Sequence, residues 1–183
     1  MFRSSNARPV TPALLVRDST EADIAAVQRI YAHYVLNALA TFEETPPPVE
    51  EMIARRNKVL DLALPYLVAD SGTSILGYCY ARAYHGRAAY RHTIEDSVYV
   101  ANGLGGRGIG AALLGALIVR CEAGPFRQTI AIIGDSGNAA SIALHRRLGF
   151  TSVGTLRSVD FKFGRRVDTA LQLALGPGDH GLP

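Results

Sequence analysis

Tryptophan is absent from this chain of 183 residues, and cysteine occurs only twice, as Cys79 and Cys121. Neither cysteine belongs to a CxxC pair or to a Cys/His spacing typical of zinc, so the sequence predicts neither a disulfide framework nor a metal site. Because free cysteine is among the most buried residue types, we expect two reduced and buried thiols.

The chain also lacks a long apolar run. No stretch approaches the ~20 apolar residues that a membrane-spanning helix needs. The first residues, MFRSSNARPVTP, lack the continuous apolar core of a signal peptide. We therefore expect a cytoplasmic protein without membrane contact.

Charge is limited as well, at 19% of residues against 48% hydrophobic residues, which excludes disorder and favours a compact globule. The net charge of +3 suits an anionic small ligand or weak nucleic-acid binding. The arginines are scattered, with no long basic run and no aromatic-basic platform, so nucleic acid is the less favoured partner.

The length fits one domain. We expect a flexible arm over residues 1–12, the domain over 13–175 and a tail over 176–183. Period-2 segments predict strands, and segments with helical spacing predict helices. The strands are expected at 14–17, 66–69, 75–84, 93–100, 129–133, 151–161 and 167–175, and the helices at about 24–34, 49–60, 109–120 and 138–148. This order predicts an α/β (α+β) fold with a mixed sheet, since hairpins adjoin a β-helix-β unit.

A glycine-rich turn joins the strand at 93–100 to the helix at 109–120. Glycine tolerates positive φ and lets the backbone approach a ligand closely. The free N–H groups and the positive dipole end of the following helix suit a phosphate or pyrophosphate, and Arg107 would add charge. The alternative is an ordinary glycine turn into a helix.

The identity of the anion is a separate question. Gly103, Gly105 and Gly108 literally match the dinucleotide pattern G-x-G-x-x-G, but that pattern usually follows the first strand of its domain, and here about 90 residues precede it. A Walker A loop requires Lys and then Ser or Thr where this chain has Ile109 and Gly110. Both nucleotide readings are therefore disfavoured.

A second cluster, Asn138-Ala-Ala-Ser-Ile-Ala-Leu-His-Arg-Arg-Leu-Gly-Phe150, closes the unit after the next strand. Together with the glycine turn it resembles the GNAT acyltransferase superfamily. The resemblance implies the GNAT acyl-CoA N-acyltransferase fold, a mixed and mostly antiparallel sheet of about six or seven strands flanked by about four helices.

Several further segments look like the phosphinothricin/methionine sulfone N-acetyltransferase family. These are Ile30–Val35, Ala40–Glu43, Pro65–Val68, Thr93–Val100 and Ser141 to His145. The resemblance implies transfer of an acetyl group from acetyl-CoA to the amine of a small amino-acid-like acceptor of the phosphinothricin, methionine sulfone or methionine sulfoximine type. It also suggests a homodimer.

The same resemblance implies a set of residues that bind acetyl-CoA. Gly105 occupies the position where the pyrophosphate motif usually opens with Arg or Gln, and Arg107 is the charge that could compensate. Asn138 either bonds the pantetheine arm or caps its helix, two roles that both suit asparagine. The implied set is Val98, Tyr99, Val100, Gly105, Gly106, Arg107, Gly108, Ile109, Gly110, Asn138 and Ser141.

Two residues are candidates for the chemistry, because amine acetylation needs a neutral amine and a stabilised leaving thiolate. Glu95, which shares a strand face with Thr93 and Ser97, is the expected base; the alternative is a satisfied strand-face carboxylate. His145 is expected to protonate the sulfur or relay the amine proton; the alternative is a hydrogen-bonded structural histidine.

For the acceptor, the resemblance assigns Arg87 to the carboxylate, and Phe42 and Tyr90 to the pocket wall, although simple core packing would also explain the two aromatic residues. The basic residue that usually lies two positions before this arginine is His85 here, and Arg82 could compensate.

Three positions where the family usually has tryptophan carry Tyr66, His92 and Arg166 instead, and we expect them near the acceptor pocket. Two alternatives remain open: a GNAT enzyme with another amine acceptor (an antibiotic, a polyamine or a protein N-terminus), and a non-catalytic acyl-CoA-binding module.

Overall fold

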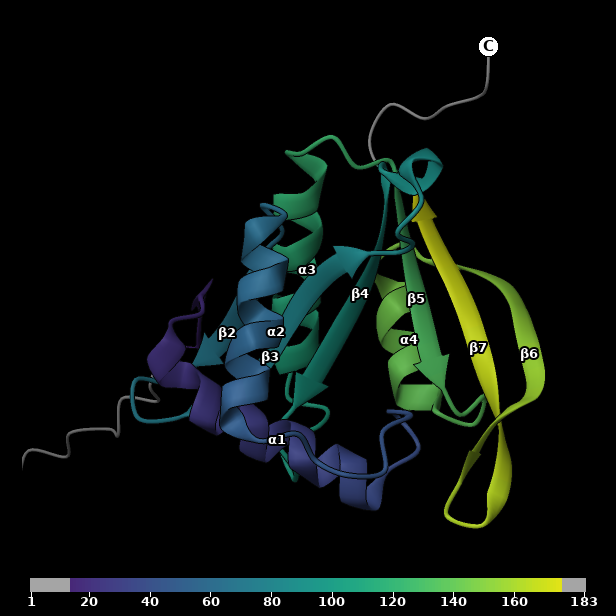
Figure 1. Ribbon diagram of the computed structural model, residues 1–183, viewed down its shortest axis with the longest axis horizontal. Helices are drawn as coiled ribbons and strands as arrows, with labels where there is room; N and C mark the ends of the chain where they lie inside the picture. Colours follow the sequence, from purple (N-terminus) through teal and green to yellow (C-terminus); the bar gives the residue numbers. More distant parts are fainter. Residues whose placement is uncertain (1–13, 176–183) are drawn as a thin grey trace, which may run out of the picture.

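A computed structural model describes residues 14–175 and shows a seven-stranded sheet with the order β1-β2-β3-β4-β5-β7-β6 (Figure 1). Only β4 and β5 pair in parallel, and every other neighbouring pair is antiparallel. The strands are β1 Leu15–Asp18, β2 Tyr66–Asp70, β3 Ile75–Ala83, β4 Thr93–Val100, β5 Gln128–Gly134, β6 Thr151–Lys162 and β7 Arg165–Leu175. The predicted mixed, mostly antiparallel sheet is confirmed, and the expected arm at 1–12 and tail at 176–183 lie outside the described residues.

Four α-helices cover the sheet, as predicted: α1 Ile24–Asn37, α2 Val49–Asp61, α3 Ile109–Glu122 and α4 Ala139–Arg147. The helices α1 and α2 lie on one face, and α3 and α4 lie on the other (Figure 1). Two short 3-10 helices, Glu21–Asp23 and Ala88–Tyr90, were not predicted from the sequence. Within residues 14–175, no helix has the length and apolar character needed to cross a membrane.

Local sequence explains where several elements begin and end. Thr20 and Asp23 form a capping box at the start of the 3-10 turn Glu21–Asp23, and the α-helix begins at the next residue, Ile24. Gly149 follows α4 with φ 94°, and Gly164 turns β6 into β7 with φ 73°. Both positions need the left-handed backbone that glycine adopts without a steric penalty.

The core contains a row of tyrosines on the face covered by α1 and α2. Tyr66, Tyr78, Tyr80 and Tyr99 stack with ring centroids 5.1–6.3 Å apart. Tyr66 is only 3% exposed, so this replacement for a family tryptophan belongs to the core. On the opposite face, Cys79 and Cys121 are buried and free, as expected.

A buried lysine joins the hairpin of β6 and β7 to the loop after α1. Lys162 Nζ donates hydrogen bonds to the carbonyl oxygens of Ala38 and Thr41, both at 2.8 Å. The side chain is 3% exposed, and burial lowers its pKa. Lys162, on the edge strand β6, therefore holds the loop that precedes Phe42.

Lys162→Met should lower the free energy of unfolding by about 2–4 kcal/mol, because each buried carbonyl left without a donor costs about 1–3 kcal/mol. Urea denaturation measures this loss. Lys58→Met, at an exposed position of α2, is the matched control. Equal stability of the Lys162 and Lys58 variants would contradict the role given to this lysine.

Candidate active site

The parallel pairing between β4 and β5 stops before either strand ends. Its last paired residues are Asp96 and Ala131, whereas β4 continues to Val100 and β5 continues to Gly134. Over this stretch β4 remains paired with β3, and β5 remains paired with β7. The sheet therefore opens between its two central strands while each strand keeps its outer partner.

The backbone of Val98 and Val100 points into this opening. Antiparallel strands alternate between residues that bond the partner and residues that face away from it. The carbonyl of Thr93 and the N–H of Ala101 both bond the β3 side, so the even-numbered residues of β4 face β5. The carbonyl of Val100 also faces away from β3, and it accepts a 2.7 Å hydrogen bond from the Tyr34 hydroxyl rather than from a strand.

The glycine turn ends at the mouth of the same opening. Gly103, Gly106 and Gly108 have φ between 75° and 81°, so the turn uses the backbone freedom for which glycine was expected. Gly108 is the N-cap of α3 and supplies no side-chain acceptor, which leaves the first N–H groups of the helix available to a ligand. The dipole of the 14-residue helix favours an anion there.

A cleft of about 510 Å³ connects these features. Its wall includes Tyr34 and Ala40 from the α1 side of the sheet, and Ser141 and Leu144 from α4 on the other side, so the cleft passes through the sheet. Most of the residues expected to bind acetyl-CoA line it: Val98, Tyr99, Val100, Gly105, Gly106, Gly108, Ile109, Gly110, Asn138 and Ser141. Arg107 is exposed on the turn and does not line the cleft.

Asn138 caps the N-terminus of α4. Its side-chain oxygen accepts a 3.2 Å hydrogen bond from the backbone N–H of Ser141, while the residue also forms part of the cleft wall. A Cβ atom at Gly110 would come within 3.1 Å of a side-chain methyl of Leu144, so α3 packs closely against α4 at this position.

Glu95 lies next to the cleft, on the face covered by α1 and α2. Its carboxylate accepts a 2.6 Å hydrogen bond from Arg82, and the residue is 6% exposed. Burial raises the pKa of Glu95, and the nearby Arg82 guanidinium offsets part of that rise. The result is a buried carboxylate of increased basicity with one cationic neighbour.

His145 is held at both ring nitrogens. Nδ1 lies 2.8 Å from the carbonyl oxygen of Ser141, and Nε2 lies 2.9 Å from Oδ2 of Asp96. Burial alone would lower the pKa of His145, but the hydrogen bond and charge of Asp96 outweigh it and raise the pKa. The ring therefore has the contacts of a hydrogen-bonded buried histidine, while it also lines the cleft.

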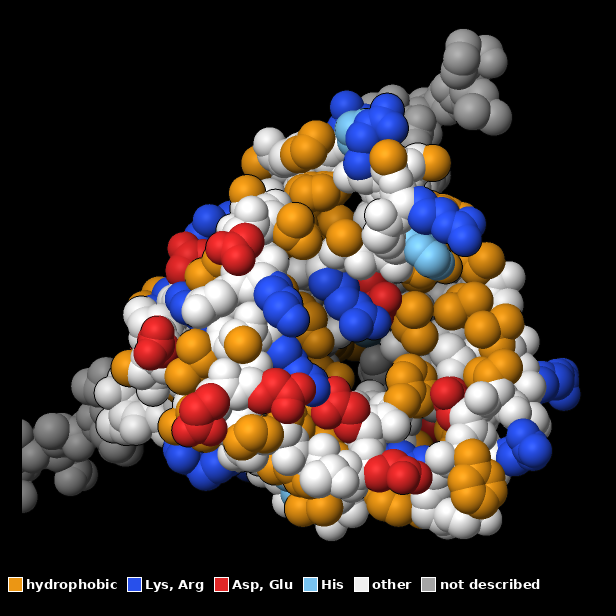
Figure 2. Space-filling view, in the orientation of Figure 1, with side chains coloured by type: hydrophobic (Ala, Val, Ile, Leu, Met, Phe, Trp, Pro, Cys, Tyr) orange, Lys and Arg blue, Asp and Glu red, His pale blue; other side chains and the backbone are white. Residues whose placement is uncertain are grey.

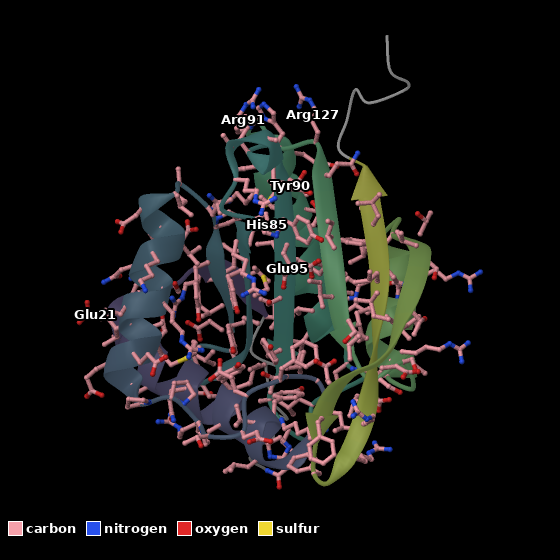
Figure 3. The ribbon with its side chains drawn as sticks, turned by 45° about the vertical axis from the view of Figure 1, so that its right-hand side comes forward. Glu21, His85, Tyr90, Arg91, Glu95 and Arg127 are labelled. Atoms are coloured by element: carbon pink, nitrogen blue, oxygen red, sulfur yellow. The ribbon has the colours of Figure 1, made fainter. Side chains whose placement is uncertain are left out.

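The residues expected to hold the acceptor come from two segments, the chain between β3 and β4 and the loop after α1, and none of them lines the cleft. Tyr90 stacks on His85 with centroids 5.2 Å apart, and Figure 3 shows this pair beyond Glu95 along β4. Arg87 is exposed in the same segment. Phe42 and Tyr90 are 48% and 40% exposed, so core packing does not explain them. The ring of Phe42 lies against Gly134 of the cleft wall.

The three positions that replace family tryptophans do not line the cleft. Tyr66 belongs to the tyrosine row, and exposed Arg166 lies on β7. His92 is exposed, and its Nδ1 lies 2.7 Å from the carbonyl oxygen of Pro125. Our expectation that they lie near the acceptor pocket stays a prediction.

Several residues of the site were not predicted. Asp96, Tyr34 and Arg147 all line the cleft. Asp96 could have been noticed as an acidic residue on the inward face of a central strand, but its partner His145 is 49 residues away and only the fold brings the two together. Figure 2 shows that the face carrying α1 and α2 is hollowed near its centre, with acidic and basic side chains around the opening.

The chain matches the acetyltransferase (GNAT) domain family over residues 16–171. This match spans most of the chain, and the protein therefore belongs to the GNAT acetyltransferase family.

Individual relatives are also similar over nearly their full length. The chain is 50% identical to phosphinothricin N-acetyltransferase of Alcaligenes faecalis, over 98% of both chains. It is 40% identical to the L-methionine sulfoximine/L-methionine sulfone acetyltransferase of Pseudomonas aeruginosa, over 88% of this chain and 95% of that one. A solved phosphinothricin acetyltransferase of Sinorhizobium meliloti, in complex with AcCoA, is 44% identical and superposes with a TM-score of 0.87, covering 93% of this chain and 92% of that one.

The raised pKa of Glu95 predicts how its removal changes stability. Between the ordinary pKa of glutamate and the raised one, the folded chain binds more protons than the unfolded chain, so stability falls as pH rises through this window. Glu95→Gln keeps an acceptor for Arg82 without the buried charge. The free energy of unfolding of Glu95→Gln, minus that of the wild type, should therefore increase as pH rises from about 4 to about 7.

Urea denaturation at both pH values measures this difference. Glu21→Gln, at an exposed carboxylate far from Glu95 (Figure 3), is the matched control. A wild type that gains stability over Glu95→Gln as pH rises would show that Glu95 is stabilised in its charged form.

Proposed function

We propose that this GNAT acetyltransferase transfers the acetyl group of acetyl-CoA to the amine of a small amino-acid-like acceptor of the phosphinothricin, methionine sulfone or methionine sulfoximine type. The observation that carries the proposal is the cleft through the sheet. Its wall places free backbone groups of β4 and the N-terminus of α3 on one continuous surface. The relatives named above support the class of acceptor.

The residues of the cleft suit the parts of acetyl-CoA. The free N–H groups at the start of α3 suit a pyrophosphate, and the inward backbone groups of Val98 and Val100 suit the amides of a pantetheine arm. When bound, acetyl-CoA supplies an activated acyl group as a thioester. Gly105 leaves the turn without the usual Arg or Gln side chain, and exposed Arg107 is the nearest cation in sequence.

Glu95 is the proposed base. An amine attacks only in its neutral form, so a proton must leave the ammonium group before or during transfer. Burial raises the pKa of the Glu95 carboxyl toward that of the proton donor, which makes it a better acceptor of that proton. Arg82, at 2.6 Å, holds the carboxylate in one orientation.

The acceptor is proposed to bind on the Glu95 side of the sheet. Arg87 would pair with its carboxylate, and Phe42 and Tyr90 would contact its side chain, because all three are exposed and Tyr90 lies beyond Glu95 along β4 (Figure 3). Arg82 is already committed to Glu95, so it is a less suitable carboxylate partner than Arg87.

We also propose that residues 13–175 form one GNAT domain that works as a homodimer in the cytoplasm. Two free, buried cysteines suit a reducing compartment. The edge strand β6 carries exposed apolar side chains, which suits contact with a second copy (Figure 2). These side chains are Val153, Leu156, Val159 and Phe161.

A thiol-release assay tests the proposed reaction. The wild type, mixed with acetyl-CoA and phosphinothricin, methionine sulfone or methionine sulfoximine, should release free thiol. Glu95→Gln should lower kcat by about 10²–10⁴ without changing the Kd for acetyl-CoA, since general-base catalysis contributes factors of that size. Turnover only with polyamines or peptide N-termini would contradict the acceptor class, and binding of acetyl-CoA without any turnover would indicate a binding module.

Arg87→Ala should raise KM for a carboxylated acceptor at least about tenfold, because a lost charge-assisted hydrogen bond is worth about 1.5–3 kcal/mol. KM for the corresponding carboxamide should change little. Arg91→Ala is the matched control, an exposed arginine of the same segment (Figure 3). Equal effects of Arg87→Ala on both acceptors would rule out carboxylate binding at this residue.

A further inference from the structure

One buried ionisable pair has no part in the reaction as described above. Asp96 and His145 lie at the closed end of the cleft, where the parallel pairing of β4 and β5 ends. Their side chains are 1% and 3% exposed. Since Glu95 and Asp96 are consecutive in a strand, their carboxylates point to opposite faces of the sheet. The acceptor-side base and this pair therefore flank the same opening.

The hydrogen bonds of the pair restrict what His145 can do. A carbonyl oxygen can only accept, so Nδ1 donates its proton to Ser141. When Asp96 is ionised it can only accept as well, and Nε2 then also carries a proton and donates it. In that arrangement the ring is an imidazolium, and neither of its protons is directed at a reactant.

Among the residues that the structure describes, the carboxyl group hydrogen-bonded to His145 is that of Asp96, on the same face of the sheet. The neighbouring groups there are the thiols of Cys79 from β3 and Cys121 from α3, whose pKa values are raised by burial, so both are neutral. Ala131 of β5 and Gln172 of β7 continue the same row of the sheet, and Arg147 of α4 lines the cleft. Glu95 lies on the opposite face.

Asp96 is itself incompletely bonded. Its second oxygen, Oδ1, is buried without a hydrogen-bond partner among the described residues. His145 is therefore the hydrogen-bond partner that this buried carboxyl has among the described residues, and a buried carboxylate without a partner is costly.

We propose that Asp96 is a positioning residue that holds His145 as an imidazolium beside the thioester end of the cleft. His145 then assists departure of the thiolate by its positive charge, without giving up a proton. This inference rests on the proposed acetyl transfer. It assigns to the pair the stabilisation that a leaving thiolate needs, whereas Glu95 removes the proton of the amine.

The first test is the titration of the His145 ring by NMR in the protein without substrates. The wild-type ring should remain protonated above the ordinary histidine value of about 6.5, and Asp96→Asn should lower the midpoint, because a neutral amide accepts the hydrogen bond without stabilising the charge. Asp70→Asn, which removes a carboxylate paired with Arg17 at the far end of β2, is the matched control. A wild-type midpoint at or below about 6.5 overturns the proposal, even where Asp96→Asn does not fold.

The second test is the pH profile of kcat for thiol release. The wild-type profile should fall at high pH where His145 loses its proton, and Asp96→Asn should move this fall to lower pH. The variant should lose about tenfold or more in kcat near pH 8 and less near pH 6, with an unchanged KM for acetyl-CoA. A pair with a structural role alone would lower kcat equally at every pH, and that result overturns the proposal.

The two tests separate this inference from the proposed function. Failure of the wild type to release thiol with any acceptor would overturn the acetyl transfer and, with it, the action of His145 on the thiolate. The NMR titration does not depend on turnover, so it still supports or overturns the charged pair in that case.

Discussion

The separation of β4 from β5 beyond Asp96 and Ala131 is the constraint on which the site depends. Backbone groups inside a sheet are normally paired, and leaving them without partners is costly. The sheet tolerates the separation because β3 and β7 hold the outer edges of the two strands. The inward groups of Val98 and the N–H of Val100 are therefore available to a ligand, and the opening connects the two faces of the molecule.

The alternation of side chains along β4 divides the chemistry between these faces. Glu95 faces α1 and α2 together with Arg82, and Asp96 faces α4 and His145. A step of one residue thus places a basic carboxylate on one side of the opening and a buried carboxyl–histidine pair on the other. An amine and a thioester that approach from opposite faces would each meet the group suited to it.

Much of the fold could be predicted from the sequence because its signals are local. Gly149 and Gly164 have positive φ where α4 and β6 end, and the glycines before α3 have the positive φ for which their residue type was expected. The 3-10 turns at Glu21–Asp23 and Ala88–Tyr90 were missed, since they are too short to show a period.

The site was predictable in part. The cleft wall follows from motifs that are contiguous in sequence, but the partners of its ionisable groups do not. Asp96 meets His145 and Lys162 meets the loop after α1 across long separations, which no spacing rule reveals. Tyr66 lies in a stack of core tyrosines whose partners come from β3 and β4, and this environment was not predicted from its position in the sequence.

Amide hydrogen exchange with and without acetyl-CoA tests the central claim most directly. If acetyl-CoA binds where β4 and β5 separate, it should slow exchange at Val98, Val100 and the first residues of α3, because these N–H groups gain acceptors. The amides of β1 and β2 should be unaffected. Protection confined to other segments, or no protection at saturating acetyl-CoA, would contradict the account.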